Sequence, residues 1–208
     1  MKPIKAWHFV TKDRRLRYGD NRYVRAGMVQ EMAGDGAPLL CERGMHASTS
    51  LLDALRCAPG PIVCRVEIWG DVALGDDKLC GRFRRVLWTV DATVVLHEFA
   101  CWCAERALRR AKVTDKRCWG AIEAKRAWLR GEISSSELDA ARAAAMDAAR
   151  AAASAAAWVA ARAAAWAAAW VAAWAAAWAA ALDAAWDAER KAQDRHLVCM
   201  LRDARRTA

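Results

Sequence analysis

Ala155 to Trp186 reads AAAWVAARAAAWAAAWVAAWAAAWAAALDAAW, and this stretch determines the structure of the last third of the chain. Alanine, the residue with the highest helix propensity, fills most positions, and neither glycine nor proline interrupts them. Larger residues recur at every fourth position, and most of them are tryptophans. The stretch therefore predicts α-helix with indole rings along one broad face.

The tryptophan stripe predicts helix packing. A step of four residues turns a regular helix by about 40° beyond a full turn, so the stripe drifts slowly around the helix. Each indole can bury roughly 200 Å², and several together exceed an ordinary exposed apolar patch. We therefore expect the stripe to pack against other helices, within the chain or between chains. The expected helix-packing interface consists of Trp158, Trp166, Trp170, Trp174, Trp178 and Trp186.

Two other interpretations of this stretch remain open. The twenty residues from Ala163 to Leu182 carry no charge, which satisfies the length of a membrane-spanning helix. Tryptophan, however, prefers the membrane interface, and the stretch holds almost no Leu, Ile or Phe. The indoles could also stack on nucleic acid, but such surfaces interleave basic residues, and Arg162 is the one basic residue within the stripe. Helix packing is the favoured interpretation.

A change of composition marks the start of the tail. All eleven glycines and all four prolines lie at or before Gly131. Ser134 and Glu137 follow with the spacing of a helix-capping box. We place a domain boundary here, between a basic domain at residues 1–131 and an alanine/tryptophan repeat tail at 132–208. The tail is expected to be one long rod or a helical hairpin.

The first domain combines strands with helices. Residues 62–69 alternate apolar and polar side chains, which predicts a half-buried strand, and residues 6–10 predict another. Residues 92–112 and 115–130 are predicted helices, the second capped by its first residue, an aspartate. The expected fold class is α+β: a small, mostly antiparallel sheet with flanking helices, followed by the helical tail.

The positive charge lies in the first domain. The chain carries a net charge of +9, and residues 1–131 hold 24 basic against 15 acidic side chains, while the tail holds nine of each. One local basic cluster consists of Arg82, Arg84 and Arg85. A basic domain favours an anionic ligand or nucleic acid as a partner, although a solvated basic surface explains the same charge.

The cysteines indicate a reducing compartment. None of the eight cysteines forms a C-x-x-C pair, and several lie in apolar runs, so buried free thiols are expected and no metal site is. The N-terminal residues contain no signal-peptide pattern, and the protein is expected to be intracellular. No P-loop, G-x-G-x-x-G, H-E-x-x-H or G-x-S-x-G motif is present, so these phosphate-binding, zinc and serine-hydrolase chemistries have no support.

Candidate site residues gather near two histidines. His8 lies in an apparent strand, and His46 lies just before a predicted helix that Ser48, Thr49 and Ser50 introduce. Backbone N–H groups at a helix start favour anions such as phosphate, so these residues are candidate ligand contacts. The alternative is that the hydroxyl groups only cap the helix and the histidines are structural.

Three segments resemble an uncharacterised domain found at the N-terminus of phage and prophage proteins with repetitive tails. The segments are CERGMHA at 41–47, VCRVEIWGDV at 63–72 and DDKL at 76–79. The resemblance covers about residues 5–100. It implies a phage or mobile-element origin and a location in the cytoplasm of a bacterial host, but it implies no activity.

The arrangement is also similar to the ADP-ribosyltransferase-like fold, including its RNA 2′-phosphotransferase branch. In this resemblance His8 takes the first site position, His46 with Ser48–Ser50 the second, and Glu67 the third. It implies cleavage of the nicotinamide–ribose bond of NAD, with Glu67 stabilising developing positive charge. The alternative for Glu67 is a surface ion pair with Arg65.

We therefore expect a phage-type accessory or interaction protein, with a helical tail for self-association or intramolecular packing. In this interpretation no cofactor is needed and the partner is a second copy of the chain. One alternative is an ADP-ribosyltransferase-like enzyme or a protein that binds NAD or another nucleotide. The other alternative is a membrane-associated protein.

Overall fold

A computed structural model describes residues 2–17, 20–151, 155–167 and 187–207. The chain forms two compact units. The sheet unit comprises the residues up to Ala92 together with those from Leu197 onward, and the helical unit is Thr93–His196. The α+β class is confirmed, because antiparallel sheets and helices occupy separate parts of the sequence.

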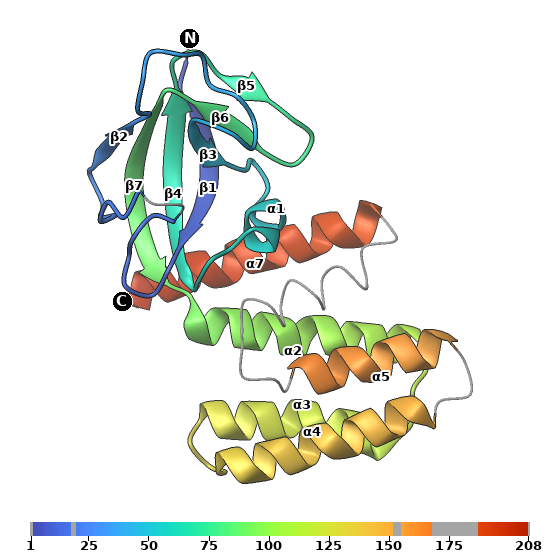
Figure 1. Ribbon diagram of the computed structural model, residues 1–208. Coiled ribbons are helices and arrows are strands. Elements are labelled where there is room, and N and C mark those ends of the chain that lie inside the picture. Colours follow the sequence, from blue (N-terminus) through green and yellow to red (C-terminus); the bar gives the residue numbers. More distant parts are fainter. Residues whose placement is uncertain (1, 18–19, 152–154, 168–186, 208) are drawn as a thin grey trace. The chain divides into compact units, whose positions relative to one another are not determined.

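A four-stranded antiparallel sheet forms the centre of the sheet unit. Its strands lie side by side in the order β1-β4-β7-β2 (Figure 1). Their bounds are β1 Ile4–Val10, β4 Ile62–Trp69, β7 Phe83–Asp91 and β2 Val29–Glu31. Along β4 the even-numbered residues are fully buried, as the alternation of the sequence predicts.

A smaller sheet and a short helix complete the sheet unit. The smaller sheet has the order β3-β6-β5, and its strands are Met45–Ala47, Leu79–Gly81 and Ala73–Leu74. Its buried side chains share one hydrophobic cluster with Ala6, Val66 and Val86 of the larger sheet. This cluster defines the inner face of the larger sheet, and the opposite side is called the outer face. Helix α1 is Leu51–Arg56.

The helical unit is built from packed helices. Its helices are α2 Thr93–Arg110, α3 Lys116–Leu129, α4 Ser135–Arg150, α5 Ala155–Ala167 and the first part of α7 Asp187–Thr207. Helices α2 to α5 pack on one another (Figure 1). Ala121, Leu138, Ala145 and Ala165 form a shared buried cluster between α3, α4 and α5. Small alanine side chains allow this close approach of helix backbones.

The described part of the tail differs from a single rod. Helix α4 starts with the predicted capping box, in which Ser134 and Glu137 bond to each other's backbone N–H groups. It ends at Arg150, and α5 packs on α2, α3 and α4. Gly131, with a φ of 75°, lies between α3 and α4. The compact units therefore divide at Ala92 rather than at the compositional boundary, because α2 and α3 pack with the tail helices.

The expected tryptophan interface is described only in part. Trp158 is 40% exposed and Trp166 is half-buried. The guanidinium of Arg162 lies 4.4 Å from both ring centroids. Within the described residues, no helix is long and apolar enough to cross a membrane. The remaining interface residues lie outside the described residues; they are Trp170, Trp174, Trp178 and Trp186. Most of the uncharged stretch Ala163–Leu182 also lies outside them.

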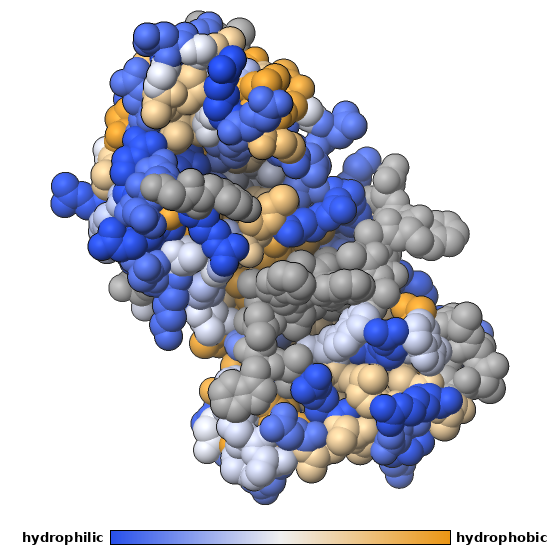
Figure 2. All heavy atoms as spheres, viewed as in Figure 1, coloured by the Kyte–Doolittle hydropathy of each residue, from blue (hydrophilic) through white to orange (hydrophobic). Residues whose placement is uncertain are grey.

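Hydrophilic residues cover most of the visible surface of the sheet unit, and hydrophobic residues form separate patches on it (Figure 2). This distribution agrees with the sequence, since the sheet unit holds most of the basic residues of the chain.

Candidate anion-binding site

Polar side chains from four strands meet on the inner face of the sheet. His8 pairs with Cys64 in the register of β1 and β4, while Arg84 on β7 pairs with Ile68 on one side and Gln30 on the other. Because side chains alternate along a strand, these residues share the face of the buried cluster. Arg84 is 2% exposed and Gln30 is 1% exposed.

Arg84 connects the two sheets. Its Nε donates a hydrogen bond to Oε1 of Gln30 at 2.8 Å, and its Nη1 donates to the backbone oxygen of His46 on β3 at 2.9 Å. Since Arg84 can only donate, the amide oxygen of Gln30 must face it, which fixes the orientation of the amide. The Nε2 of Gln30 then has no hydrogen-bond partner although it is buried.

The site has more hydrogen-bond donors than acceptors. Within the described residues, no carboxylate lies at ion-pair distance from Arg84. The negative charge of Asp20 attracts Arg84 without a direct contact, because Arg22 binds that carboxylate through Nε at 2.5 Å and Nη2 at 2.8 Å. Burial lowers the pKa of Arg84 to about 10, so it stays charged at neutral pH. A buried cation and an unpaired amide donor are both costly, unless an acceptor binds between them.

The two histidines lie within electrostatic reach of Arg84 and are uncharged at neutral pH. Burial, then the charge of Arg84 and then His46, hold the pKa of His8 well below 6.5. Burial is also the largest cause that lowers the pKa of His46. Nε2 of His46 accepts from the backbone N–H of Cys41 at 3.1 Å, so Nδ1 carries the proton and donates to the oxygen of Gly44 at 3.0 Å. His8 is only partly buried.

The positive potential extends along the inner face. Arg14 donates a hydrogen bond through Nη1 to Oγ1 of Thr89 at 2.6 Å, and Thr89 pairs with Cys64 in the register of the sheet. Burial raises the pKa of the Cys64 thiol to about 11, while Arg84 and Arg14 act against that rise. Cys64 is therefore a neutral thiol at pH 7, and it supplies no anion to balance the arginines.

Glu67 lies on the other face of the sheet, which corrects its expected place beside the histidines. It pairs with Lys5 in the register of β1 and β4, and Lys5 is three residues from His8, so the two positions face opposite sides. Its Oε2 lies 3.7 Å from Nη1 of Arg85. Glu67 forms a surface ion pair, although with Arg85 rather than with Arg65.

The hydroxyl residues before α1 have structural roles. Ser48 is buried, and its backbone forms two hydrogen bonds with Trp7. Thr49 is exposed. Ser50 is the N-cap of α1, and its Oγ accepts from the N–H of Asp53 at 3.3 Å. The capping interpretation is confirmed for Ser50, and a helix of six residues offers no anion site at its start.

Sequence reasoning missed Arg84 and Gln30 as site residues. Arg84 was part of a basic cluster, where a solvent-facing role is the usual assumption. Its position two residues before the buried Val86 could have indicated an inward side chain, since the two share a face of β7. Gln30 lies on a strand of three residues, which is too short to show a pattern.

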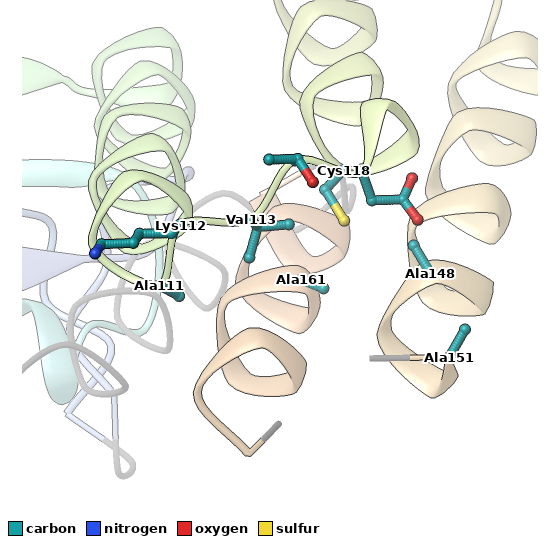
Figure 3. A pocket seen from close by; sticks show the side chains of 9 residues that line it. Ala111, Lys112, Val113, Cys118, Ala148, Ala151 and Ala161 are labelled. Carbon is teal, nitrogen blue, oxygen red and sulfur yellow. The ribbon is translucent and has the colours of Figure 1, made fainter. Parts of the chain in front are cut away.

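A cavity of about 260 Å³ in the helical unit is a weaker candidate (Figure 3). Val113, Cys118 and four alanines line it: Ala148 lies on α4 and Ala161 on α5, while Ala111 and Ala151 directly follow α2 and α4. The carboxylate of Asp115 at its edge is bound by the backbone and guanidinium of Arg117. Lys112 and Thr114 are the other polar residues of its lining. In the described part of the chain, no three His, Cys, Asp or Glu side chains are placed to hold a metal ion.

No protein-family model, curated protein or solved structure matches the chain. The phage-type and ADP-ribosyltransferase-like resemblances therefore rest on the sequence segments quoted above.

Proposed function

We propose that the sheet unit binds a ligand through a phosphate group on the inner face of the larger sheet. The observation that carries this proposal is the buried guanidinium of Arg84, which has no carboxylate partner within the described residues. Gln30 offers a free amide donor on the same face, and His8 adds a partly accessible ring. An anion would satisfy these donors together.

A phosphate group suits this donor set better than a carboxylate. Arginine binds phosphate oxygens with two parallel N–H groups, and a phosphate has enough oxygens to accept from an amide and an imidazole as well. This favours the nucleotide-binding alternative over ADP-ribosyl transfer, since Glu67 is on the opposite face. We propose an accessory protein of phage type, acting in the cytoplasm of a bacterial host, with a phosphate-bearing small molecule as its ligand.

For the tail we propose intramolecular packing. The support is the burial of alanines along α5, which packs on three other helices of the same chain. The buried alanines are Ala160, Ala161, Ala163, Ala164, Ala165 and Ala167. Self-association through the tryptophan stripe is the competing proposal, and the molecular mass distinguishes the two.

The test of the anion site is calorimetric titration of the full chain with inorganic pyrophosphate. We expect Arg84→Gln to weaken binding at least ~10-fold, because a charge-assisted hydrogen bond contributes about 1.5–3 kcal/mol. Arg25→Gln is the matched control, since Arg25 is an exposed arginine of the same unit, and it should bind as the native chain does.

Arg84 also holds strands together, so a second variant is needed. His8→Asn changes a partly exposed ring and should weaken pyrophosphate binding while thermal unfolding stays close to native. Failure of the native chain to bind pyrophosphate would refute the proposal. Equal binding by the native chain, folded Arg84→Gln and His8→Asn would refute it as well.

A further inference from the structure

The outer face of the larger sheet carries aromatic and basic side chains in alternating positions. Trp7, Arg65 and Trp88 are direct neighbours across β1, β4 and β7. Four residues along β4, Trp69 pairs with Phe83. This face is separate from the proposed anion site, because the site residues project from the other side of the same strands.

Ring contacts group these residues into two clusters, one around Trp7 and one around Trp69. The guanidinium of Arg65 lies 4.3 Å from the ring centroid of Trp7, and the rings of Trp7 and Trp88 meet edge-on at 5.7 Å. The rings of Trp69 and Phe83 stack at 5.5 Å. The guanidinium of Arg85 lies 5.4 Å from the Trp69 ring. Each cluster thus combines flat rings with a guanidinium group.

The outer face is positively charged, and the cluster around Trp69 is partly open to solvent, whereas Trp7 is buried. The side chain of Arg85 is 53% exposed, Lys5 is exposed, and Trp69, Phe83 and Trp88 are half-buried. From α7, Arg205 lies 4.9 Å from the Trp88 ring, and both Arg205 and Arg202 are exposed. The acidic residues of this face are fewer; on the described strands they are Glu67 and Glu31.

Arg65 retains an unused donor in the cluster around Trp7. Its Nη1 is buried and has no hydrogen-bond partner. Burial, together with the charge of Arg202, lowers the pKa of Arg65. The positive charges of Arg65 and Arg202 repel each other, so binding of an anion near them would be favourable because it would reduce this repulsion.

We propose that the outer face binds single-stranded nucleic acid. Its chemistry combines the two requirements of such a surface, flat side chains for base stacking and cations for the phosphate backbone. A duplex is a poor fit, because its bases are already stacked and cannot expose their ring faces to a sheet.

The test is fluorescence anisotropy of the full chain with a labelled oligothymidine of about 20 nucleotides, longer than the roughly 4–16 nucleotides that small single-strand binding domains occupy. We expect saturable binding that weakens between about 50 and 200 mM salt. A duplex of equal length should bind more weakly. Pyrophosphate at matched ionic strength should not displace the oligonucleotide, which separates this surface from the proposed anion site.

Variants localise the binding. Trp69→Ala removes a stacking surface, and Arg85→Gln removes an exposed cation without disturbing the core. We expect Trp69→Ala to weaken oligonucleotide binding by roughly 5- to 150-fold. We expect Arg85→Gln to weaken it by a smaller factor. The matched control is Arg109→Gln, since Arg109 also lies over an indole, 5.9 Å from the Trp119 ring, but in the helical unit.

Each outcome bears on the proposal. Loss of binding in both sheet variants, with the control unchanged and all variants folded by thermal unfolding, supports it. No binding by the native chain, or equal loss in the Arg109→Gln control, overturns it. Equal affinity for duplex and single strand also overturns it, because charge alone would then explain the interaction.

Discussion

At the scale of single residues, Arg84 is the organising feature of the inner face. It has almost no contact with water and stays charged, and within the described residues its hydrogen bonds go to a side-chain amide oxygen and a backbone oxygen. His8 and His46 add rings that are neutral at pH 7. Such an arrangement costs stability in the free protein, and that cost is what a bound anion would remove.

Anion binding should depend on pH through His8. Because the free-state pKa of His8 lies well below 6.5, an anion beside the ring would raise it and cause proton uptake. Affinity for inorganic sulfate, whose own charge is constant in this range, should therefore rise as pH falls from 7.5 toward 5.5. Calorimetry at several pH values measures this, with a slope of up to about one log unit per pH unit.

The variant His8→Asn should flatten that pH profile. His46 is a poorer source of the effect, since protonation of its Nε2 would break the bond from the Cys41 N–H. If the sulfate affinity of the folded His8→Asn variant depends on pH as steeply as that of the native chain, a group other than His8 takes up the proton. Measuring the heat of binding in buffers of different ionisation enthalpy counts the protons directly.

Two of the predicted site residues, His8 and His46, lie within electrostatic reach of Arg84 in the proposed anion site, and Glu67 lies on the opposite face of the sheet. His8 and His46 were singled out because histidines beside strands are rare enough to be noticed. Glu67 was misplaced because its side depends on the pairing register of β1 and β4, which one sequence does not reveal. Arg84 was missed because a buried arginine is uncommon, and its neighbours on the chain are also arginines.

At the scale of elements, the alternating strand at β4 and the capped start of α4 were both predictable. Each depends on local rules, the two-residue period of a strand and the reciprocal bonds of a capping box. The end of α4 was not predictable. Alanine has no helix-terminating signal, so a repeat without glycine or proline leaves the position of a break undetermined.

Buried alanine on α5 should not tolerate a larger side chain. Ala164 is fully buried, and Ala164→Leu should lower the free energy of unfolding by about 1–3 kcal/mol because the packed helices must move apart. The control Ala140→Leu places the same change on an exposed position of α4 and should be nearly neutral. Urea unfolding of both variants checks this, and a neutral Ala164→Leu would contradict the packed arrangement.

At the scale of the whole molecule, the packed tail predicts a monomer. Light scattering of the full chain in detergent-free buffer should give a mass near 22.9 kDa. A multiple of that mass would instead support association between copies through the tryptophan stripe. In that case Trp158→Ala, which removes the 40%-exposed ring, should shift the mass back toward that of a monomer.

The sheet unit is discontinuous in sequence, since its last part follows the entire helical unit. Leu197 and Leu201 are fully buried, and Arg205 covers the Trp88 ring. A ribosome adding about 5–20 residues per second needs on the order of 5–20 s to make the hundred or so residues between the two parts. During translation the sheet unit therefore lacks its last part for that time, and its packing is complete only after Leu197 and Leu201 have been made.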